Sequence, residues 1–238
     1  MKFAIIAAGE GSRLSQEGIA LPKPLVRIGG EPMIDRLLRI FKENGADETV
    51  VIVNRLHPQT EAHIRNLMEA GTHGKIRLVV KTTPSSMHSF YELSEHLVDA
   101  PFCLTTVDTI FREKEFAEYI QAFKQYNGDG MMAVTDFIDD EKPLYVGTDE
   151  SLNITAFNDS NQGDRYISGG IYSLHPKALK TLQRCMNEGQ SRMRNFQRGL
   201  VTDGLQLKAY PFTKILDVDH AGDIEKAEAF LTETTLNK

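Results

Sequence analysis

Short apolar runs alternate with segments of helical periodicity through the first half of the chain. The runs have the length of buried strands, and the segments between them carry apolar residues three or four positions apart, as one face of a helix does. Alternation of this kind requires right-handed crossovers and implies a mostly parallel sheet, whose ligands bind at the carboxyl ends of the strands. The expected strands are residues 3–6, 50–53, 76–80 and 102–107, and the expected helices are residues 33–41, 60–70, 87–97 and 116–123.

The second half of the chain has a different pattern, with more strands and fewer helices. Residues 144–146 and 154–157 are expected to form a small β-hairpin across a polar turn. The two halves together predict an α/β fold: a Rossmann-like, mixed but mostly parallel sheet with helices on both faces and the hairpin in the second half. No repeat or linker marks a boundary, so we expect one domain over residues 1–238. Further strands are expected at 131–135, 167–174, 205–210 and 215–218, and further helices after Pro176 and over 193–200 and 224–231.

A glycine-rich segment begins where the first expected strand ends. Gly9 and Gly11 have no Cβ, so a ligand can approach the main chain and backbone N–H groups can point at an anion. Arg13 presents a planar fork that suits phosphate oxygens, and Lys23 is a cation held between two prolines on a stiffened backbone. The segment therefore predicts a phosphate-binding site. Its spacing is not that of a dinucleotide fingerprint, since Leu14 stands where the third glycine belongs, and it is not that of a Walker loop.

The charge balance limits what the partners can be. The net charge of −6 at pH 7 argues against a nucleic acid or an anionic membrane as partner, because binding either needs a broad basic face. No apolar run approaches the length of a membrane span. Cys103 and Cys185 stand in unrelated contexts, so neither a disulfide framework nor a cysteine metal site is indicated. We expect small, enclosed phosphate ligands and a reducing, cytoplasmic environment, while the oligomeric state stays unknown.

Two motifs in register resemble a known family. The first is the glycine-rich segment with Ser12, Arg13 and Leu14, and the second is the run PKPL that begins at Pro22. Together they resemble the N-terminal signature of the nucleotidyltransferase superfamily, in particular the sugar-1-phosphate nucleotidyltransferases, or NDP-sugar pyrophosphorylases. The resemblance implies that residues about 1–130 bind the nucleotide and that residues about 131–238 bind the acceptor. It also implies that Arg13 and Lys23 are catalytic and that the nucleotide lies against Ala8, Gly9, Gly11, Ser12 and Arg13.

Acidic residues follow two of the expected strands. Asp108 comes directly after strand 102–107 and resembles the family's first metal-binding aspartate. Near the C-terminus, the run ILDVDHAGDI resembles the family's second metal motif, in which Asp217 and Asp219 are both candidates because residues two apart on a strand share a face. The resemblance implies a Mg²⁺ ion between Asp108 and Asp217 or Asp219. Magnesium suits such a site because it prefers hard oxygen ligands and is typically held by one or two carboxylates plus substrate phosphates.

The segment expected to bind the acceptor departs from the family pattern. The run ISGGIY at residues 167–172 resembles a strand whose small residues let a sugar lie against the backbone, with Ser168 where asparagine is common. The resemblance implies acceptor contacts from Ser168, Gly169 and Gly170. The E-K-P segment that often brings a second phosphate-binding lysine before this strand is missing, which weakens the assignment of a hexose 1-phosphate. Lys214, close in sequence to the aspartates, could supply the missing charge.

The segment expected to contact the base is also unusual. The run KTTPSSMHSF begins at Lys81, where many sugar pyrophosphorylases have a glutamine and then a glycine-rich turn. Lys81 and Ser86 take those places, so the resemblance implies that both contact the nucleotide. The arrangement looks equally like that of cytidylyltransferases acting on phosphocholine or polyol phosphates, and the base therefore stays open. Ser85 or Ser86 is also expected to cap the helix that follows.

These motifs together imply a magnesium-dependent nucleotidyltransferase whose partners are a nucleoside triphosphate and a phosphorylated small-molecule acceptor. The acceptor phosphate, in the first instance that of a sugar 1-phosphate, attacks the α-phosphorus in line, and pyrophosphate leaves. Since the nucleophile is already an anion, the protein needs no general base and has to position and neutralise two polyanions. Two alternatives stay open: a cytidylyltransferase acting on phosphocholine or a polyol phosphate, and a non-catalytic domain of the same fold that senses nucleotides or sugars.

Overall fold

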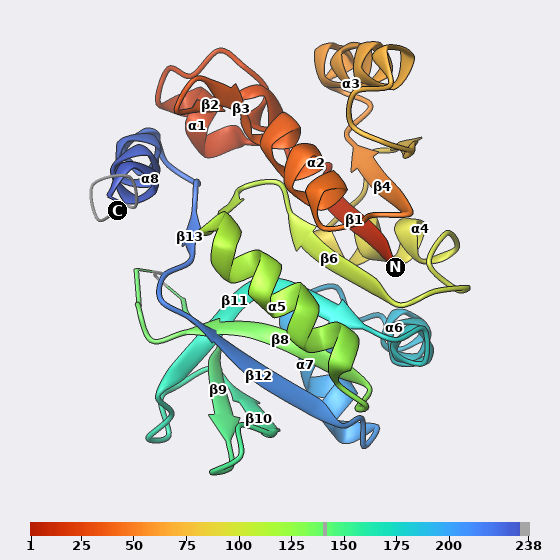
Figure 1. Cartoon of the computed structure of the whole chain (residues 1–238), viewed down its shortest axis with the longest axis vertical. Helices are drawn as coiled ribbons and strands as arrows, with labels where there is room; N and C mark the ends of the chain where they lie inside the picture. The colour runs from red at the N-terminus through yellow and green to blue at the C-terminus, as the bar shows by residue number, and fades with distance from the viewer. Residues whose placement is uncertain (140–141, 234–238) are drawn as a thin grey trace.

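The computed structural model describes residues 1–139 and 142–233 of the chain. Within them, nine strands form one mixed sheet that runs through both halves of the sequence (Figure 1). The strands of the first half are parallel, as the alternation of strands and helices predicts. β1 (Lys2–Ala7) pairs with β4 (Glu48–Val53) and with β6 (Phe102–Thr106), and β4 pairs with β5 (Ile76–Val80).

The other strands of the sheet come from the second half of the chain. They are β8 (Gly130–Thr135), β9 (Tyr145–Thr148), β10 (Ile154–Asn158), β11 (Tyr166–Leu174) and β12 (Leu207–Phe212). β11 joins the two halves, because it runs antiparallel to β8 on one side and antiparallel to β6 and β9 on the other. β12 lies parallel to β8, and β9 with β10 forms the antiparallel hairpin, which is confirmed.

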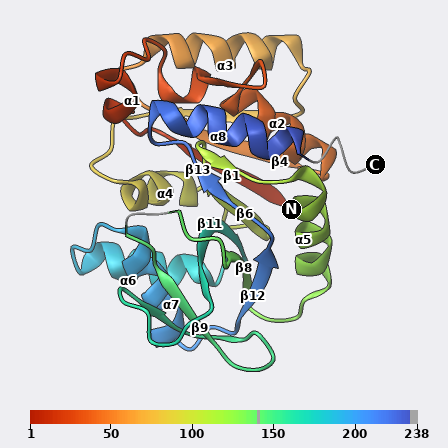
Figure 2. The same cartoon turned by 90° about the vertical axis from the view of Figure 1, so that its left-hand side faces the viewer.

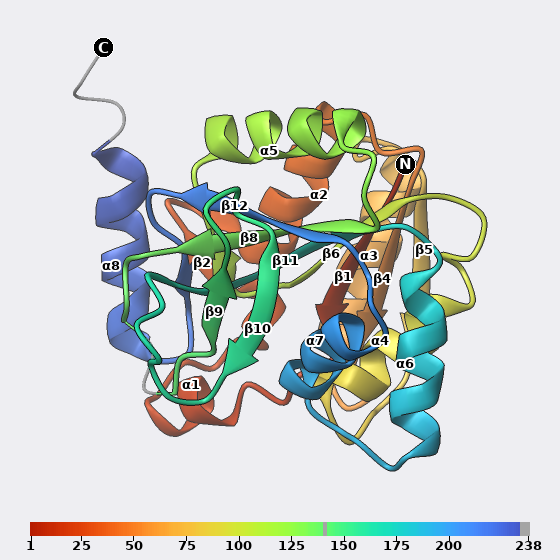
Figure 3. The same ribbon diagram turned by 90° about the horizontal axis from the view of Figure 1, so that it is seen from below.

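Helices cover both faces of the sheet (Figures 2 and 3). One face carries α2 (Met33–Glu43), α3 (Pro58–Ala70), α5 (Glu113–Gln125) and α8 (Ala221–Thr232). The other carries α4 (Ser86–Ser94), α6 (Ala178–Asn187) and α7 (Met193–Thr202). The predicted Rossmann-like α/β fold is thereby confirmed. The division into a nucleotide-binding and an acceptor-binding half stays a prediction.

The central strand β1 explains why its sequence is a continuous apolar run. Phe3 and Ile5 belong to the core under α2 and α5, whereas Ala4 and Ile6 belong to the core under α4. A strand that is covered by helices on both faces has no solvent side, so its residues do not alternate between apolar and polar. The ring of Phe3 packs 4.6 Å from that of Phe41 in α2, measured between centroids.

The expected and observed boundaries of the helices differ by a few residues. α4 ends at Ser94 rather than at residue 97, because the chain continues in tighter turns in which Leu97 N–H donates to Ser94 O at 3.0 Å. α6 begins at Ala178, two residues after Pro176. The longest helices that the structure describes, α3 and α5, have 13 residues each, and none is long and apolar enough to cross a membrane.

Strand ends bring distant acidic residues to one edge of the sheet. β13 (Leu216–Asp217) pairs antiparallel with β7 (Thr109–Ile110), and Asp217 lies opposite Thr109. Asp108 lies between β6 and β7, so it stands at the carboxyl end of β6, next to the glycine-rich segment that follows β1. A small ribbon of β2 (Arg27–Ile28) and β3 (Glu31–Pro32) precedes α2.

Candidate active site

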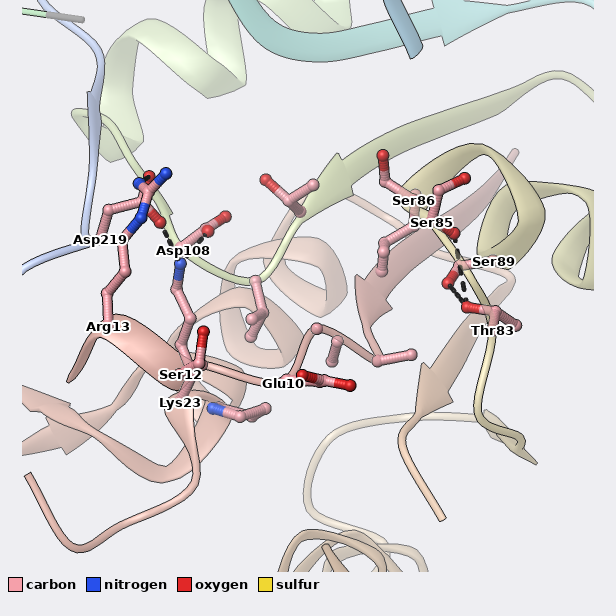
Figure 4. Close-up of a pocket in the computed structure, with 18 of the residues that line it drawn as sticks. Glu10, Ser12, Arg13, Lys23, Thr83, Ser85, Ser86, Ser89, Asp108 and Asp219 are labelled. Carbon is pink, nitrogen blue, oxygen red and sulfur yellow. Dashed lines mark hydrogen bonds and ion pairs between the residues drawn. The ribbon is translucent and has the colours of Figure 1, made fainter. Parts of the chain in front are cut away.

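A cavity of about 340 Å³ opens at the carboxyl ends of β1 and β6. Figure 4 shows charged side chains on one side of it, around Lys23, and hydroxyl side chains on the other, contributed by the segment between β5 and α4 and by the start of α4. Thr83 and Ser89 contact each other through their hydroxyl groups at 2.6 Å, and Ser85 caps α4 by accepting a hydrogen bond from His88 N–H. The predicted nucleotide-binding residues that line this cavity are Ala8, Gly9, Gly11, Ser12, Arg13 and Ser86.

Gly11 is required by the local geometry. It precedes the short helix α1 (Ser12–Gln16) with φ of 62°, in the left-handed region that favours glycine. A Cβ at this position would lie 3.0 Å from the Cβ of Lys23, in the 3₁₀ turn η1 (Lys23–Leu25). The absence of a side chain at Gly11 therefore lets the lysine approach the glycine-rich segment. Gly9 differs, because no heavy atom lies within 4 Å of where its Cβ would be.

Gly11→Ala is expected to destabilise the protein and to displace Lys23, whereas Gly9→Ala is a matched control for the change in Tm only. A left-handed alanine costs about 1–2 kcal/mol, which corresponds to a fall in Tm of roughly 3–6 °C for a chain of this size. Turnover should fall about tenfold, because small displacements of a positioning group are costly. Thermal melts and kcat/KM of both variants provide the measurement. Equal Tm values for the two variants would contradict the geometric requirement at Gly11.

A buried amide supports the glycine-rich segment from β4. Asn54 is 2% exposed, and its Nδ2 donates to the carbonyl of Ala8 at 3.0 Å. Its Oδ1 accepts hydrogen bonds from Thr82 Oγ1 at 2.7 Å and from Leu56 N–H at 3.0 Å. Sequence reasoning missed this residue. The available signal was a polar side chain directly after a buried parallel strand, at the edge where ligands bind.

Lys23 lies between two carboxylates near the carboxyl end of β6. Its Nζ contacts Asp108 Oδ2 and lies 2.7 Å from Asp219 Oδ1, while Arg13 Nη1 lies 3.1 Å from Asp219 Oδ2. The Lys23 side chain is only 11% exposed. Burial alone would lower the pKa of Lys23, but Asp108 and Asp219 outweigh it and hold that pKa above its ordinary value. The lysine therefore carries a positive charge and is held between two carboxylates.

A second cavity of about 470 Å³ adjoins the first and lies between β11, β13 and the start of α8. Ser168, Gly169 and Asp217 line it, and Arg13 and Asp219 line both cavities. Ser168 Oγ donates to Gln197 Oε1 at 2.9 Å. Three further cationic side chains, which the sequence motifs did not indicate, also line the second cavity. They are Lys142, Arg194 and Lys226.

The two glycines of the ISGGIY run serve a bulge in β11. The register of β11 against β8 shifts between Ser168 and Tyr172, where four positions on β11 match two on β8. Gly170 has φ of 73°, and a Cβ on Gly169 would overlap Ile215 Cδ1. Packing and backbone geometry thus account for both glycines, and the acceptor contact that the sequence suggested stays a prediction. Of the two, Gly169 is a lining residue of the second cavity.

Two predicted contact residues stand apart from the cavities. Lys81 lies outside the first cavity, and its Nζ pairs with Glu92 in α4 at 2.6 Å. Lys214 lies against aromatic rings and not against the aspartates. Its Nζ lies over the ring of Phe137 at 4.3 Å and over that of Phe230 at 5.3 Å. The predicted contact between Lys214 and the acceptor therefore stays a prediction, and in this structure the lysine contacts aromatic rings.

The comparison with protein families decides what this arrangement belongs to. The family model described as the MobA-like NTP transferase domain matches residues 3–200. This chain belongs to that family. The nucleotidyltransferase resemblance of the GEGSRL and PKPL motifs is thereby confirmed.

The NTP transferase domain is similar to several named proteins. The protein named probable mannose-1-phosphate guanylyltransferase 1 of Oryza sativa subsp. japonica is 30% identical over 191 residues, covering 77% of this chain and 52% of the relative. The mannose-1-phosphate guanyltransferase of Emericella nidulans is 27% identical over 197 residues, with the same coverage of 77% and 52%. The chain thus spans about half the length of these curated relatives.

A solved structure supports the fold over the whole length. The inositol-1-phosphate CTP transferase from T. maritima superposes with a TM-score of 0.77 at 18% identity, covering 97% of both chains. An identity this low shows the shared fold and leaves the substrate to other arguments.

Three aspartates near Lys23, namely Asp108, Asp217 and Asp219, have the properties of a cation site. Asp108 Oδ1 is buried and has no hydrogen-bond partner among the residues that the structure describes. Burial and the charges of Asp108 and Asp219 raise the pKa of Asp217 to about 8. Because the side chain of Asp217 is exposed to the second cavity, the neighbouring negative charges are a main cause of this raised pKa. Such mutual repulsion is what a bound divalent cation relieves.

The same residues suit magnesium better than a transition metal. Within residues 1–139 and 142–233, no group of three or more His, Cys, Asp or Glu residues converges as a ready metal cage. Magnesium does not need such a cage, because substrate phosphates and waters complete its octahedron. Asp108 and Asp219 both contact Lys23 Nζ, so they lie well within the roughly 10 Å that one hydrated ion spans.

Proposed function

We propose that this chain transfers a nucleoside monophosphate from a nucleoside triphosphate to a phosphorylated acceptor, in the first instance a sugar 1-phosphate, and releases pyrophosphate. One observation carries the proposal: two adjoining cavities share Arg13 and Asp219, and Lys23 contacts Asp219 at that junction. A transfer between two phosphorylated substrates needs their phosphates to meet at one point between their binding sites. The shared wall offers that point.

The chain's own residues would act by positioning and charge neutralisation. The amides around Gly9 and Gly11, together with Arg13, would hold the triphosphate, and Lys23 would exchange its carboxylate partners for the reacting phosphates. Asp108 with Asp217 or Asp219 would hold Mg²⁺, which when bound neutralises charge on the phosphate oxygens. The acceptor phosphate needs no base, because it is already an anion.

The second cavity supports a phosphorylated acceptor. Arg13, Lys142, Arg194 and Lys226 line it, and they can compensate the charge of an acceptor phosphate. The names of the guanylyltransferase relatives point to a hexose 1-phosphate as that acceptor. A cytoplasmic location is part of the proposal, since Cys103 and Cys185 are both buried free thiols, as expected of a reducing compartment.

A second candidate is a cytidylyltransferase that acts on a polyol phosphate. The inositol-1-phosphate CTP transferase matches nearly the whole of both chains, whereas the guanylyltransferase relatives are about twice as long as the matched part. The hydroxyl-lined wall formed by Thr83, Ser85, Ser86 and Ser89 can donate or accept hydrogen bonds, so it suits more than one base.

A grid of triphosphates against acceptor phosphates tests the proposal, with pyrophosphate release as readout. GTP, CTP, UTP and dTTP are each combined with mannose 1-phosphate, glucose 1-phosphate, inositol 1-phosphate and phosphocholine, with Mg²⁺ or with EDTA. We expect one pair to dominate and EDTA to reduce its rate at least about 10²-fold, since a metal supplies several kcal/mol of charge stabilisation. Nucleotide binding without turnover on any acceptor would instead favour the sensing domain, and full turnover in EDTA would remove magnesium from the mechanism.

A further inference from the structure

One side of α1 is attached to the start of α8, more than two hundred residues away in sequence (Figures 1 and 2). Arg13 lies in α1 and Glu17 is the C-cap residue of that helix, four positions further on, so both side chains lie on the same side of it. Arg13 Nη1 lies 3.1 Å from Asp219 Oδ2. Glu17 Oε1 lies 2.6 Å from His220 Nδ1, and Glu17 Oε2 accepts a hydrogen bond from Ala221 N–H at 2.6 Å. Three successive residues, 219–221, are thus bonded to α1.

The same segment is also anchored to its own helix. Asp223 Oδ2 accepts hydrogen bonds from His220 N–H at 2.8 Å and from Asp219 N–H at 3.2 Å, as part of a capping box. The segment from Asp219 to Ala221 is therefore held by two sets of hydrogen bonds. One set comes from Asp223 in α8, and the other comes from Glu17 at the end of α1. Glu17 itself lines neither cavity, so it acts on the site through the segment that it holds.

Substrate binding would alter the other links between these parts. Under the proposed function, Arg13 and Lys23 turn to the phosphates, and Asp219 loses the two cations that it contacts in this structure. Among the residues that the structure describes, the hydrogen bonds of Glu17 are then those that still join α1 to the 219–221 segment without using a substrate-binding group.

We propose that Glu17 is a positioning residue for nucleotidyl transfer. It holds Asp219 and its neighbours against the glycine-rich segment while Arg13 and Lys23 exchange carboxylates for phosphates. The inference rests on the proposed function, since it assumes that those two cations bind the nucleotide. A segment released by loss of Glu17 would be in the competent position for only part of the time, and the apparent nucleotide affinity would fall by that fraction.

Glu17→Ala is expected to raise KM for the magnesium nucleotide about tenfold while kcat changes less than about threefold. Glu17→Gln keeps an amide oxygen that can accept the Ala221 N–H, so it should recover part of the affinity. Glu61→Ala is the matched control, because Glu61 in α3 pairs with Arg65 at 2.7 Å and lines neither cavity. The Tm of all three variants should stay within about 2 °C of wild type, as for other surface ion pairs.

Two measurements that need no turnover complete the test. Calorimetric titration with the magnesium complexes of GTP, CTP, UTP and dTTP should show about tenfold weaker binding by Glu17→Ala for whichever nucleotide the wild type binds. Amide hydrogen exchange without nucleotide should be faster at residues 219–222 in this variant. If the wild type binds none of the four nucleotides, the proposed function fails. If the wild type binds and Glu17→Ala binds equally well, or loses no more than Glu61→Ala, the positioning role alone is overturned.

Discussion

Lys23→Ala is expected to lower kcat/KM by at least about 10²-fold, because a preorganised cation at the point of charge development is worth several kcal/mol in the transition state. The lysine is well placed for this role. It is 11% exposed, contacts Asp108 and Asp219, and lies at the junction of the two cavities. Because its pKa is raised, it stays charged at neutral pH. Steady-state kinetics with the best substrate pair measure the effect.

The same substitution should also lower stability. Removing Lys23 leaves Asp108 and Asp219 close together without the cation that separates them, which costs about 2 kcal/mol and lowers Tm by roughly 4–8 °C. Lys75→Ala is a suitable control, because Lys75 lies 3.1 Å from buried Glu48, which keeps Arg77 as a partner. Near-normal turnover of Lys23→Ala would return this lysine to a purely structural role.

Asp108→Asn should abolish magnesium-dependent turnover, with a loss of at least about 10²-fold, while the protein remains folded. The reason lies in the carboxylate itself. Its Oδ1 is buried without a hydrogen-bond partner in the described part of the chain, and its charge helps raise the pKa of Asp217, so the carboxylate lies where a cation is favoured. Asparagine keeps the shape and an oxygen for Lys23 but removes the negative charge.

The stability of Asp108→Asn distinguishes a cation site from a structural ion pair. Relief of the repulsion with Asp217 offsets the weaker contact to Lys23, so the free energy of unfolding should change by less than about 1 kcal/mol. Asp99→Asn serves as control, since Asp99 is an exposed carboxylate that pairs with Lys2 at 2.7 Å. Turnover that persists with an unchanged magnesium requirement would show that Asp108 is not a ligand.

The order of strands and helices was predictable because it depends on local patterns. Residues 76–80 form β5 as expected, and the helix expected over residues 60–70 is α3, which ends at Gly71 with φ of 66°. Buried parallel strands need continuous apolar runs, and helices between them need one apolar stripe. The hairpin β9–β10 was predictable for the same reason, since a polar turn separates two short apolar runs.

The candidate site was predictable where a motif is contiguous in sequence. The glycine-rich segment, Lys23 and Asp108 lie around one cavity, as expected for the carboxyl edge of a parallel sheet. Their roles, the magnesium ion and the choice between Asp217 and Asp219 stay predictions. Motif comparison does not predict where a long side chain lies. In this structure Lys81 pairs with Glu92, and Lys214 lies over the ring of Phe137.

Periodicity and contiguous motifs made the α/β architecture, the family and the sheet edge of the candidate site predictable from the sequence. Which side chains meet at that edge depends on tertiary contacts. The contacts that matter join segments distant in sequence. Asn54 donates a hydrogen bond to Ala8, Lys23 contacts Asp108, and Glu17 accepts a hydrogen bond from Ala221 at the start of α8. Such contacts depend on the crossing of strands and helices and on side-chain rotamers, and neither leaves a period in the sequence.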